Sequence, residues 1–335
     1  MKILITGGAG FIGANTAGHY LKKGHDVTVY DNLHRKNVEK NIEWLKKTFD
    51  KRTLSVKIAD VRNYRMLKNE IKKADVIFHF AGQTAVTTSI EKPMEDFEMN
   101  AIGTFNVLEA MREQGSKAIM VYSSTNKVYG EMSRVRTASR GKRYVSIESP
   151  SIDESETLSF YSPYGNSKGT GDQYTLDYAR MYGLRTIVFR QSCIYGTHQF
   201  GVEDQGWVAH FSACAIQGKP ITIFGDGKQV RDILFIDDLV EAFEKAVRHI
   251  GITAGEVYNI GGGIDNTVSL LELIEMLEKR SGKKIKTKLG KERLGDQKNY
   301  VSNVDKAYRD FGWRPTTSVK TGINKLYTWL ENALT

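Results

Sequence analysis

The stretch Ile3-Leu-Ile-Thr-Gly-Gly-Ala-Gly-Phe-Ile-Gly13 decides the fold of this chain. Its glycines fit both G-x-G-x-x-G, counted from Gly8, and G-x-x-G-x-x-G, counted from Gly7. Glycine at such a turn allows positive φ and lets the backbone approach a pyrophosphate, and the following helix aims free amide groups at the phosphates. The apolar run before the glycines predicts a strand, and the stretch from Ile12 to Lys23 predicts a helix. The pattern therefore indicates a dinucleotide-binding turn.

A carboxylate follows the next apolar run. Residues 27–30 predict a second strand, which ends in Asp31, 18 residues after Gly13. An acid at this distance binds the adenosine ribose hydroxyls and repels a 2′-phosphate, so NAD is favoured over NADP. The basic cluster His34, Arg35 and Lys36 is the counter-argument, because it offers a clamp for that phosphate. We interpret the cluster as a solvated loop.

Short apolar strands alternate with helical stretches along the chain. Further strands are predicted at 54–58, 76–80, 118–122 and 185–189. This alternation predicts an α/β fold, a Rossmann doubly wound parallel sheet with helices on both faces. A chain of 335 residues exceeds the usual single domain. We expect an NAD-binding Rossmann domain at 1–190, to which the chain returns at about 231–262, and a smaller α/β substrate domain at 191–230 and 263–335.

The composition excludes several classes of protein. No run of 18 apolar residues and no signal peptide is visible, so a membrane partner is not expected. Cys193 and Cys214 make neither a disulfide framework nor a metal quartet, and both suit a reducing cytoplasm. The net charge is +9, but the lysines are scattered, which favours an anionic small substrate over nucleic acid.

An acid/base set is predicted at Tyr164 and Lys168. The two side chains stand one helical turn apart, after the helix start Ser162-Pro163. Tyrosine is a poor base because its pKa is about 10. An ammonium one helical turn away, with the positive charge of the nicotinamide nearby, lowers that pKa by favouring the phenolate. With the Thr125 hydroxyl to hold a substrate oxygen, the set moves a hydride to or from a carbon that bears a hydroxyl.

The longest insertion runs from about residue 131 to 159. It is basic at its start and acidic later. Loops this long inside a compact domain are usually functional or disordered. Because it lies between Thr125 and Tyr164, we expect a lid over the active site, with a solvated loop as the alternative.

These motifs resemble an extended short-chain dehydrogenase/reductase of the nucleotide-sugar-modifying kind, over essentially the full length. Among them are residues 6–13, 31–32, 60–61, 100–104 and 225–232. Stretches 83–89, 124–130, 190–196 and 199–207 resemble the CDP-paratose 2-epimerases, also called CDP-tyvelose 2-epimerases. The resemblance implies a redox-neutral epimerase that holds NAD tightly and inverts C2 of a CDP-hexose through a 2-keto sugar. It also implies a homodimer or homotetramer, formed through helices at 96–112 and 164–182.

The resemblance assigns three groups of site residues. The catalytic residues are Thr125, Tyr164 and Lys168. The cofactor-binding residues are Gly7, Gly10, Phe11, Ile12, Gly13, Asp31, Asn32, Asp60, Val61, Ala81, Gly82, Gln83, Asn100, Ser123, Tyr164 and Lys168. The substrate-binding residues are Gln83, Thr87, Thr125, Asn126, Lys127, Cys193, Gln205, Arg231 and Arg293, of which the two arginines suit a diphosphate.

Departures from related enzymes narrow the chemistry. The 4,6-dehydratases carry Thr-Asp-Glu where this chain has Thr125-Asn126-Lys127, and an amide with an ammonium cannot replace that acid and base. The 4-epimerases usually carry asparagine where this chain has Cys193, which favours a different sugar pose. A 4-epimerase, a UDP-glucuronate-decarboxylase-like enzyme, or an NAD-sensing or RNA-binding member of the fold stay open as alternatives. The nucleotide base and the sugar's 6-hydroxyl also stay open.

Overall fold

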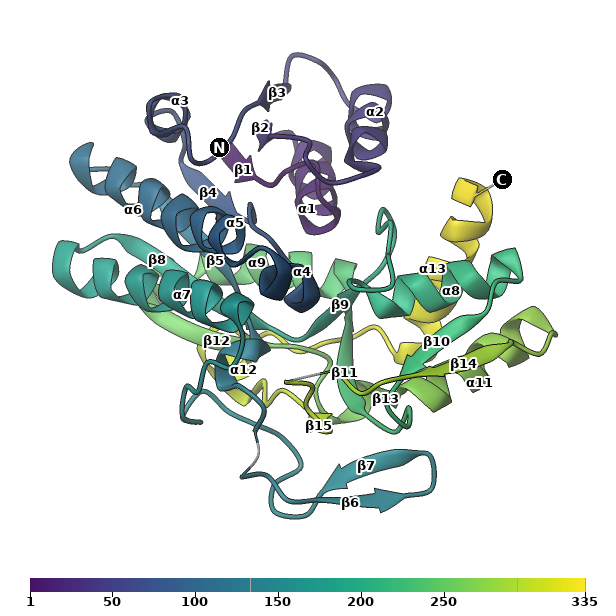
Figure 1. Ribbon diagram of the computed structural model, residues 1–335. Helices are drawn as coiled ribbons and strands as arrows, with labels where there is room; N and C mark the ends of the chain where they lie inside the picture. The colour runs from purple at the N-terminus through teal and green to yellow at the C-terminus, as the bar shows by residue number, and fades with distance from the viewer. Residues whose placement is uncertain (133, 294, 335) are drawn as a thin grey trace.

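A parallel sheet dominates the computed structural model, which describes residues 1–132, 134–293 and 295–334 (Figure 1). Within the described residues the sheet has seven strands in the order β12-β8-β5-β4-β1-β2-β3. The strands are β1 (Lys2–Thr6), β2 (Asp26–Asp31), β3 (Leu54–Ile58), β4 (Val76–His79), β5 (Ile119–Thr125), β8 (Arg185–Gln191) and β12 (Glu256–Ile260). All neighbouring pairs are parallel, which confirms the predicted doubly wound class.

Helices cover both faces of this sheet. One face carries α1 (Phe11–Lys22), α2 (Val38–Thr48) and α9 (Ile236–Arg248), and the other carries α3 (Tyr64–Ile71), α6 (Gly103–Glu113) and α7 (Pro163–Tyr182). Successive side chains of a strand point to opposite faces. Ile3 and Ile5 therefore pack under α1 and α9, whereas Leu4 packs against α3 and α6. Burial on both faces explains why β1 is a continuous apolar run.

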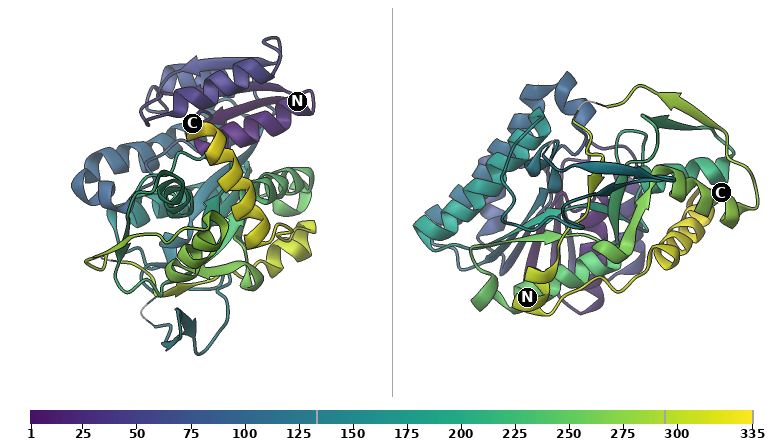
Figure 2. Two further views of the ribbon diagram at one scale, coloured as in Figure 1. Left: turned by 90° about the vertical axis from the view of Figure 1, so that its right-hand side faces the viewer. Right: turned by 90° about the horizontal axis from the view of Figure 1, so that it is seen from below.

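A smaller α/β unit lies beyond the carboxyl ends of the strands (Figure 2). Its strands are β9 (Cys193–Tyr195), β10 (Ile221–Phe224), β11 (Val230–Phe235), β13 (Thr267–Ser269), β14 (Thr287–Gly290) and β15 (Asn299–Tyr300). Its helices are α8 (Trp207–Gln217), α11 (Leu270–Ser281) and α13 (Val319–Leu334), whereas α12 (Asp305–Phe311) packs against β12 of the large sheet. Short elements complete the fold: α4 (Val86–Glu91), α5 (Pro93–Phe97), α10 (Ile250–Thr253), the 3₁₀ turns η2 (Asn126–Tyr129) and η3 (Ile264–Asn266), and the π-helical η1 (Glu98–Ile102).

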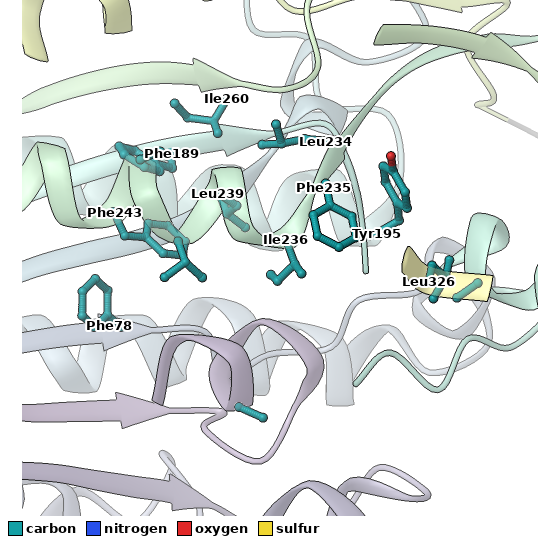
Figure 3. Close-up of a cluster of buried hydrophobic side chains, with 14 of the residues drawn as sticks. Phe78, Phe189, Tyr195, Leu234, Phe235, Ile236, Leu239, Phe243, Ile260 and Leu326 are labelled. Carbon is teal, nitrogen blue, oxygen red and sulfur yellow. The ribbon is translucent and has the colours of Figure 1, made fainter. Parts of the chain in front are cut away.

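One continuous apolar cluster joins the sheet to the smaller unit (Figure 3). Phe243 of α9 stacks near Phe78 and Phe189, with ring centroids 5.5 and 5.4 Å away. The cluster continues through Phe235 to Leu326 of α13, both buried. Because buried aromatic side chains contribute large apolar areas, this shared core fixes the smaller unit against the strand ends.

The helix expected at 96–112 is interrupted. The chain passes from α5 through the π-helical turn η1 into α6, with the Thr104 hydroxyl donating to the Asn100 carbonyl at 2.6 Å. Single π turns inside helices often mark functional sites. In the described part of the chain, no helix combines the length and the apolarity needed to cross a membrane.

Candidate active site

A cavity of about 870 Å³ opens where the strands end and runs into the smaller unit. This is where ligands bind in open α/β sheets. All the predicted site residues lie in the described ranges, and among them only Asn100 does not line the cavity. Asn100 is fully buried behind Gly82, and its Nδ2 donates to Asp96 and to Ser167.

The glycine turn forms a cradle at one end of the cavity. Gly7 has a φ of 68°, and a Cβ there would lie 2.6 Å from the Ala81 nitrogen. A Cβ on Gly13 would collide with the Gly7 carbonyl. The helix α1 begins directly after the turn, at Phe11, and presents its N-terminal amides to the cavity. The shape of this cradle fits the pyrophosphate of a dinucleotide.

Asp31 stands at the end of β2, beside the cradle. Its Oδ2 accepts from the Ala9 nitrogen at 3.0 Å and its Oδ1 from the Leu33 nitrogen at 2.8 Å. Burial raises the pKa of Asp31, and the backbone hydrogen bonds oppose that shift. The neighbouring Asn32 donates to Asp60 at 2.8 Å, which fixes the next stretch of the lining. The position of Asp31 fits the adenosine ribose of NAD.

All three residues of the basic cluster, His34, Arg35 and Lys36, are exposed, in keeping with the interpretation as a solvated loop, and Arg35 also contacts the lining of the cavity. The Arg35 guanidinium donates to the Thr84 hydroxyl at 3.2 Å and to Oε1 of Gln205, so that it bridges two walls of the cavity. Lys36 is exposed and does not line the cavity. The predicted substrate residue Gln205 is therefore already held by a cation.

The predicted catalytic residues meet at the end of β5. Ser162 caps α7 by accepting from the Gly165 nitrogen at 3.1 Å, which places Tyr164 and Lys168 on one face of the helix. Tyr164 is buried and hydrogen-bonded to Thr125. The Lys168 ammonium lies 4.3 Å from the ring centroid of Tyr122.

A lower pKa of Tyr164 was expected beside both Lys168 and the nicotinamide, and in the protein alone the pKa shifts the other way. Burial raises the pKa of Tyr164 to about 12, although its hydrogen bond with Thr125 opposes the shift. Burial also lowers the pKa of Lys168 to about 7, against the attraction of Asp172 and Asp96. Desolvation disfavours both the phenolate of Tyr164 and the ammonium of Lys168. This effect outweighs their attraction across one helical turn.

Sequence reasoning missed the carboxylates that support this set. Asp96 accepts from the Ser167 hydroxyl, and Asp172 accepts from the Ser124 hydroxyl at 2.6 Å. Both carboxylates are buried close to Lys168. The only signal in the sequence is an acid at a core-facing helical position, which a pattern of apolar residues does not reveal.

The two predicted arginines lie at the end of the cavity opposite the glycine cradle, and each forms an ion pair with a carboxylate of the protein. Arg231 is buried and donates to Oδ1 of Asp296 at 2.6 Å. Arg293 donates to Asp204 at 2.9 Å and lies 4.0 Å over the ring of Phe224. Both guanidiniums line the cavity, in keeping with a diphosphate site, whereas Asp296 was not predicted.

Asn126 and Cys193 line the same cavity, but each side chain is already hydrogen-bonded to another residue of the protein. Asn126 donates to Gln297 at 3.0 Å. The Cys193 thiol accepts from the Trp207 indole at 3.4 Å, and burial raises its pKa, which disfavours a nucleophilic thiolate.

Gln191 and Thr87 line the cavity, and each has a buried polar atom that no described residue of the protein satisfies. Gln191 is 5% exposed and stands opposite Thr125 on the neighbouring strand, and its Nε2 has no hydrogen-bond partner among the described residues. The same holds for the Thr87 hydroxyl oxygen. Since buried polar groups are normally hydrogen-bonded, both atoms fit contacts to a polar ligand. Gln191 was not among the predicted residues.

The predicted lid is wrong. The insertion folds into the hairpin β6 (Thr137–Arg140) and β7 (Arg143–Ser146), which projects at the end of the molecule opposite β3 (Figure 1). Arg143 donates to both oxygens of Glu272 at 2.8 and 2.7 Å. None of the described residues of 131–159 lines the cavity. Ion pairs to α11 hold the hairpin away from the site.

The fold and this cavity are those of a short-chain dehydrogenase/reductase of the extended class. Residues 4–326 match the family described as GDP-mannose 4,6 dehydratase. The chain therefore belongs to this family of extended short-chain dehydrogenases/reductases.

Individual relatives are similar over the whole length. The chain is 43% identical to CDP-paratose 2-epimerase from Salmonella typhi, over 99% of this chain and 100% of that protein. It is 30% identical to a putative UDP-glucose 4-epimerase from Methanocaldococcus jannaschii, over 98% of each. A solved UDP-glucuronic acid 4-epimerase from Bacillus cereus, in complex with UDP-glucuronic acid and NAD, is similar with a TM-score of 0.86, 29% identity, and coverage of 99% of this chain and 100% of that chain.

Proposed function

We propose that this protein is an NAD-dependent epimerase that inverts C2 of a CDP-hexose. The observation that carries the proposal is the identity of 43%, over the whole chain, to CDP-paratose 2-epimerase. The cavity supports it, because one continuous space joins the glycine cradle to Thr125, Tyr164 and Arg231. NAD is the cofactor of choice, since Asp31 repels a 2′-phosphate and the similar 4-epimerase structure contains NAD.

The residues of this chain divide the chemistry as follows. Bound NAD supplies the acceptor and donor of hydride, and its positive charge favours a phenolate at Tyr164. Tyr164 takes the proton of the C2 hydroxyl and later returns it, while the Thr125 hydroxyl holds the oxygen. Inversion at C2 would pass through a 2-keto sugar, whose oxygen Thr125 and Tyr164 would hold while the sugar turns. Lys168 favours the phenolate in its charged form.

Dehydration is disfavoured by the contacts at the end of β5. Asn126 donates to Gln297 and Lys127 to Asp296, so the chain has an amide and a paired ammonium where dehydration needs a carboxylic acid and a carboxylate base. The runner-up activities, 4-epimerisation and UDP-glucuronate decarboxylation, need no such pair.

Product analysis tests the proposal. Purified protein is incubated with CDP-, UDP-, GDP- and dTDP-hexoses, with Tyr164→Phe as the control. We expect a C2 epimer from a CDP-hexose. Conversion at C4 alone, or loss of CO₂ from UDP-glucuronate, would select a runner-up activity. No turnover of any substrate would favour an NAD-sensing or RNA-binding role.

We further propose that the protein is a homodimer and that α6 and α7 form the interface between its two copies. The two helices run side by side (Figure 1) and expose the apolar side chains Phe105, Tyr174 and Tyr182, and the preceding α5 and η1 add Phe97 and Ile102. Exposed apolar patches of this kind mark interaction sites. Light scattering after size exclusion should give twice the chain mass, and Phe105→Glu should give the monomer. A wild-type monomer would contradict the proposal.

A further inference from the structure

Two consecutive residues of the catalytic segment pair with two consecutive residues of the smaller unit. Asn126 Nδ2 donates to Gln297 Oε1 at 3.0 Å, and Lys127 Nζ lies 3.5 Å from Asp296 Oδ1. Gln297 is fully buried and donates onward to the Gly130 carbonyl at 2.7 Å. The backbone nitrogen of Lys127 also donates to the Thr125 hydroxyl at 3.2 Å. The Lys127 ammonium is therefore held at a fixed place relative to the catalytic threonine.

Lys127 and Arg231 carry two positive charges beside the single negative charge of Asp296. Asp296 Oδ1 accepts from Arg231 at 2.6 Å and from Lys127 at 3.5 Å, so that two cations share one carboxylate oxygen. The second donor contact of Lys127 goes to the Gly295 carbonyl at 3.3 Å. An ammonium has three donors. One donor is thus left for a ligand in the cavity, which Lys127 lines with 21% of its side chain exposed.

The position of the reacting carbon decides where the substrate's charge must lie. In a nucleotide sugar the diphosphate is attached at C1. C2 is the direct neighbour of C1, whereas C4 lies across the ring. An enzyme that presents C2 to Thr125 and Tyr164 must therefore bring the first phosphate much closer to these hydroxyls than a 4-epimerase does. A cation close to Thr125 compensates that negative charge.

We propose that Lys127 is the specificity-determining residue that selects C2, because its ammonium binds the phosphate attached to C1 of the sugar. Asp296 is a positioning residue, since it holds Lys127 and Arg231 together as a paired cation for the diphosphate. The proposal rests on the proposed 2-epimerase function and adds the group that sets the sugar's pose.

Binding of two nucleotides without a sugar tests the contact separately from catalysis. CDP carries the phosphate in question, and CMP lacks it. We expect Lys127→Met to weaken CDP binding by about 10- to 100-fold, as for a lost hydrogen bond to a charged group, with CMP binding unchanged. Lys127→Arg should restore most of the CDP affinity. Lys288→Met, an exposed lysine on β14, is the control and should bind CDP like the wild type.

Calorimetry on the purified holoenzyme measures the affinity of each variant for CDP and for CMP. Equal weakening of CDP and CMP, or no weakening, overturns the proposal. If Lys127→Met does not fold, Lys127→Gln is judged by the same criteria, because its amide keeps donors for Gly295 and Asp296.

The choice of carbon is the second readout. For a wild type that turns over CDP-hexose at C2, Lys127→Met should lower the ratio of C2 to C4 epimer at least about tenfold, whereas a purely structural role would lower the overall rate at a constant ratio. A constant ratio overturns the selection of C2 by Lys127. A wild type inactive at C2 refutes the proposed function, while the comparison of CDP with CMP still decides whether Lys127 touches the phosphate.

Discussion

Arg190 and Asp172 form a buried two-point ion pair close to Lys168, with Nε to Oδ2 and Nη2 to Oδ1 both at 3.0 Å. Their side chains are 4% and 0% exposed. Asp172 also accepts from the hydroxyl of Ser124, the residue before Thr125 on β5. The pair therefore ties α7 to β5 and β8, close to the acid/base set.

Removal of this carboxylate should be costly. Asp172→Ala leaves the guanidinium buried and unpaired, so we expect a loss of about 3–5 kcal/mol in the free energy of unfolding. Arg52→Ala breaks an exposed ion pair with Asp50 and should leave the free energy of unfolding nearly unchanged. Urea denaturation followed by circular dichroism measures both. Equal losses for the two variants would show that the buried pair has no special role.

The phenol of Tyr164 should be required for turnover but not for binding. Tyr164→Phe removes the proton acceptor and should lower kcat by two to four decades, about 3–5 kcal/mol in barrier. Nucleotide affinity should stay within a factor of about two, because the ring remains. Steady-state kinetics and calorimetry provide the two values. Near-full turnover of this variant would assign the base elsewhere.

Lys168 should make stability depend on pH. Its pKa falls from 10.5 to about 7 on folding, so between these values the unfolded chain binds the extra proton. The free energy of unfolding contributed by this group therefore rises as pH increases from about 7. Tyr164 acts oppositely above about pH 10, because its pKa is raised to about 12.

The comparison is best made between pH 7 and 10, with Lys168→Met as the reference. The wild type should gain stability relative to the variant across this window, measured by denaturant unfolding at each pH. Parallel curves would mean that Lys168 is not desolvated in the folded protein.

Much of the site was predictable where the chemistry depends on neighbours in sequence. The glycine turn, Asp31 and the pair Tyr164 and Lys168 each lie within one local motif. Asp296 was missed because its partner Lys127 is 169 residues away, and no local pattern records that pairing. In the protein alone the pKa of Tyr164 is raised, because burial, which depends on the whole fold, outweighs the one-turn spacing from Lys168.

The prediction that the insertion at 131–159 forms a lid was wrong for a related reason. Its length and its place between Thr125 and Tyr164 favoured a lid. Its basic residues instead find carboxylates on α11, Arg143 with Glu272 and Lys142 with Glu275. The hairpin therefore packs where it finds carboxylates more than a hundred residues away in sequence, and not over the residues that flank it in the chain.

The cofactor should stay with the enzyme. A cycle that returns its hydride gives NAD no reason to leave, so we expect purified protein to carry NAD(H) and to need none added. Denaturation followed by chromatography of the released nucleotide measures this. Protein without nucleotide, active in proportion to added NADP, would contradict both the epimerase cycle and the assignment of Asp31 to the adenosine ribose.

The carbon that reacts can be read from isotopes. A CDP-hexose deuterated at C2 should epimerise with a primary kinetic isotope effect and keep its label at C2, because the same hydride leaves and returns. Deuterium at C4 should give no primary effect. The physical basis is the lining beside Thr125, where Asn126 is bound to Gln297 and Cys193 to Trp207, so the groups used for 4-keto chemistry elsewhere are absent from these positions. Competitive rates by mass spectrometry and label positions by NMR give both values. A primary effect at C4, or solvent deuterium at C3 or C5, would assign the chain to a 4-keto mechanism and leave the fold and family as they stand.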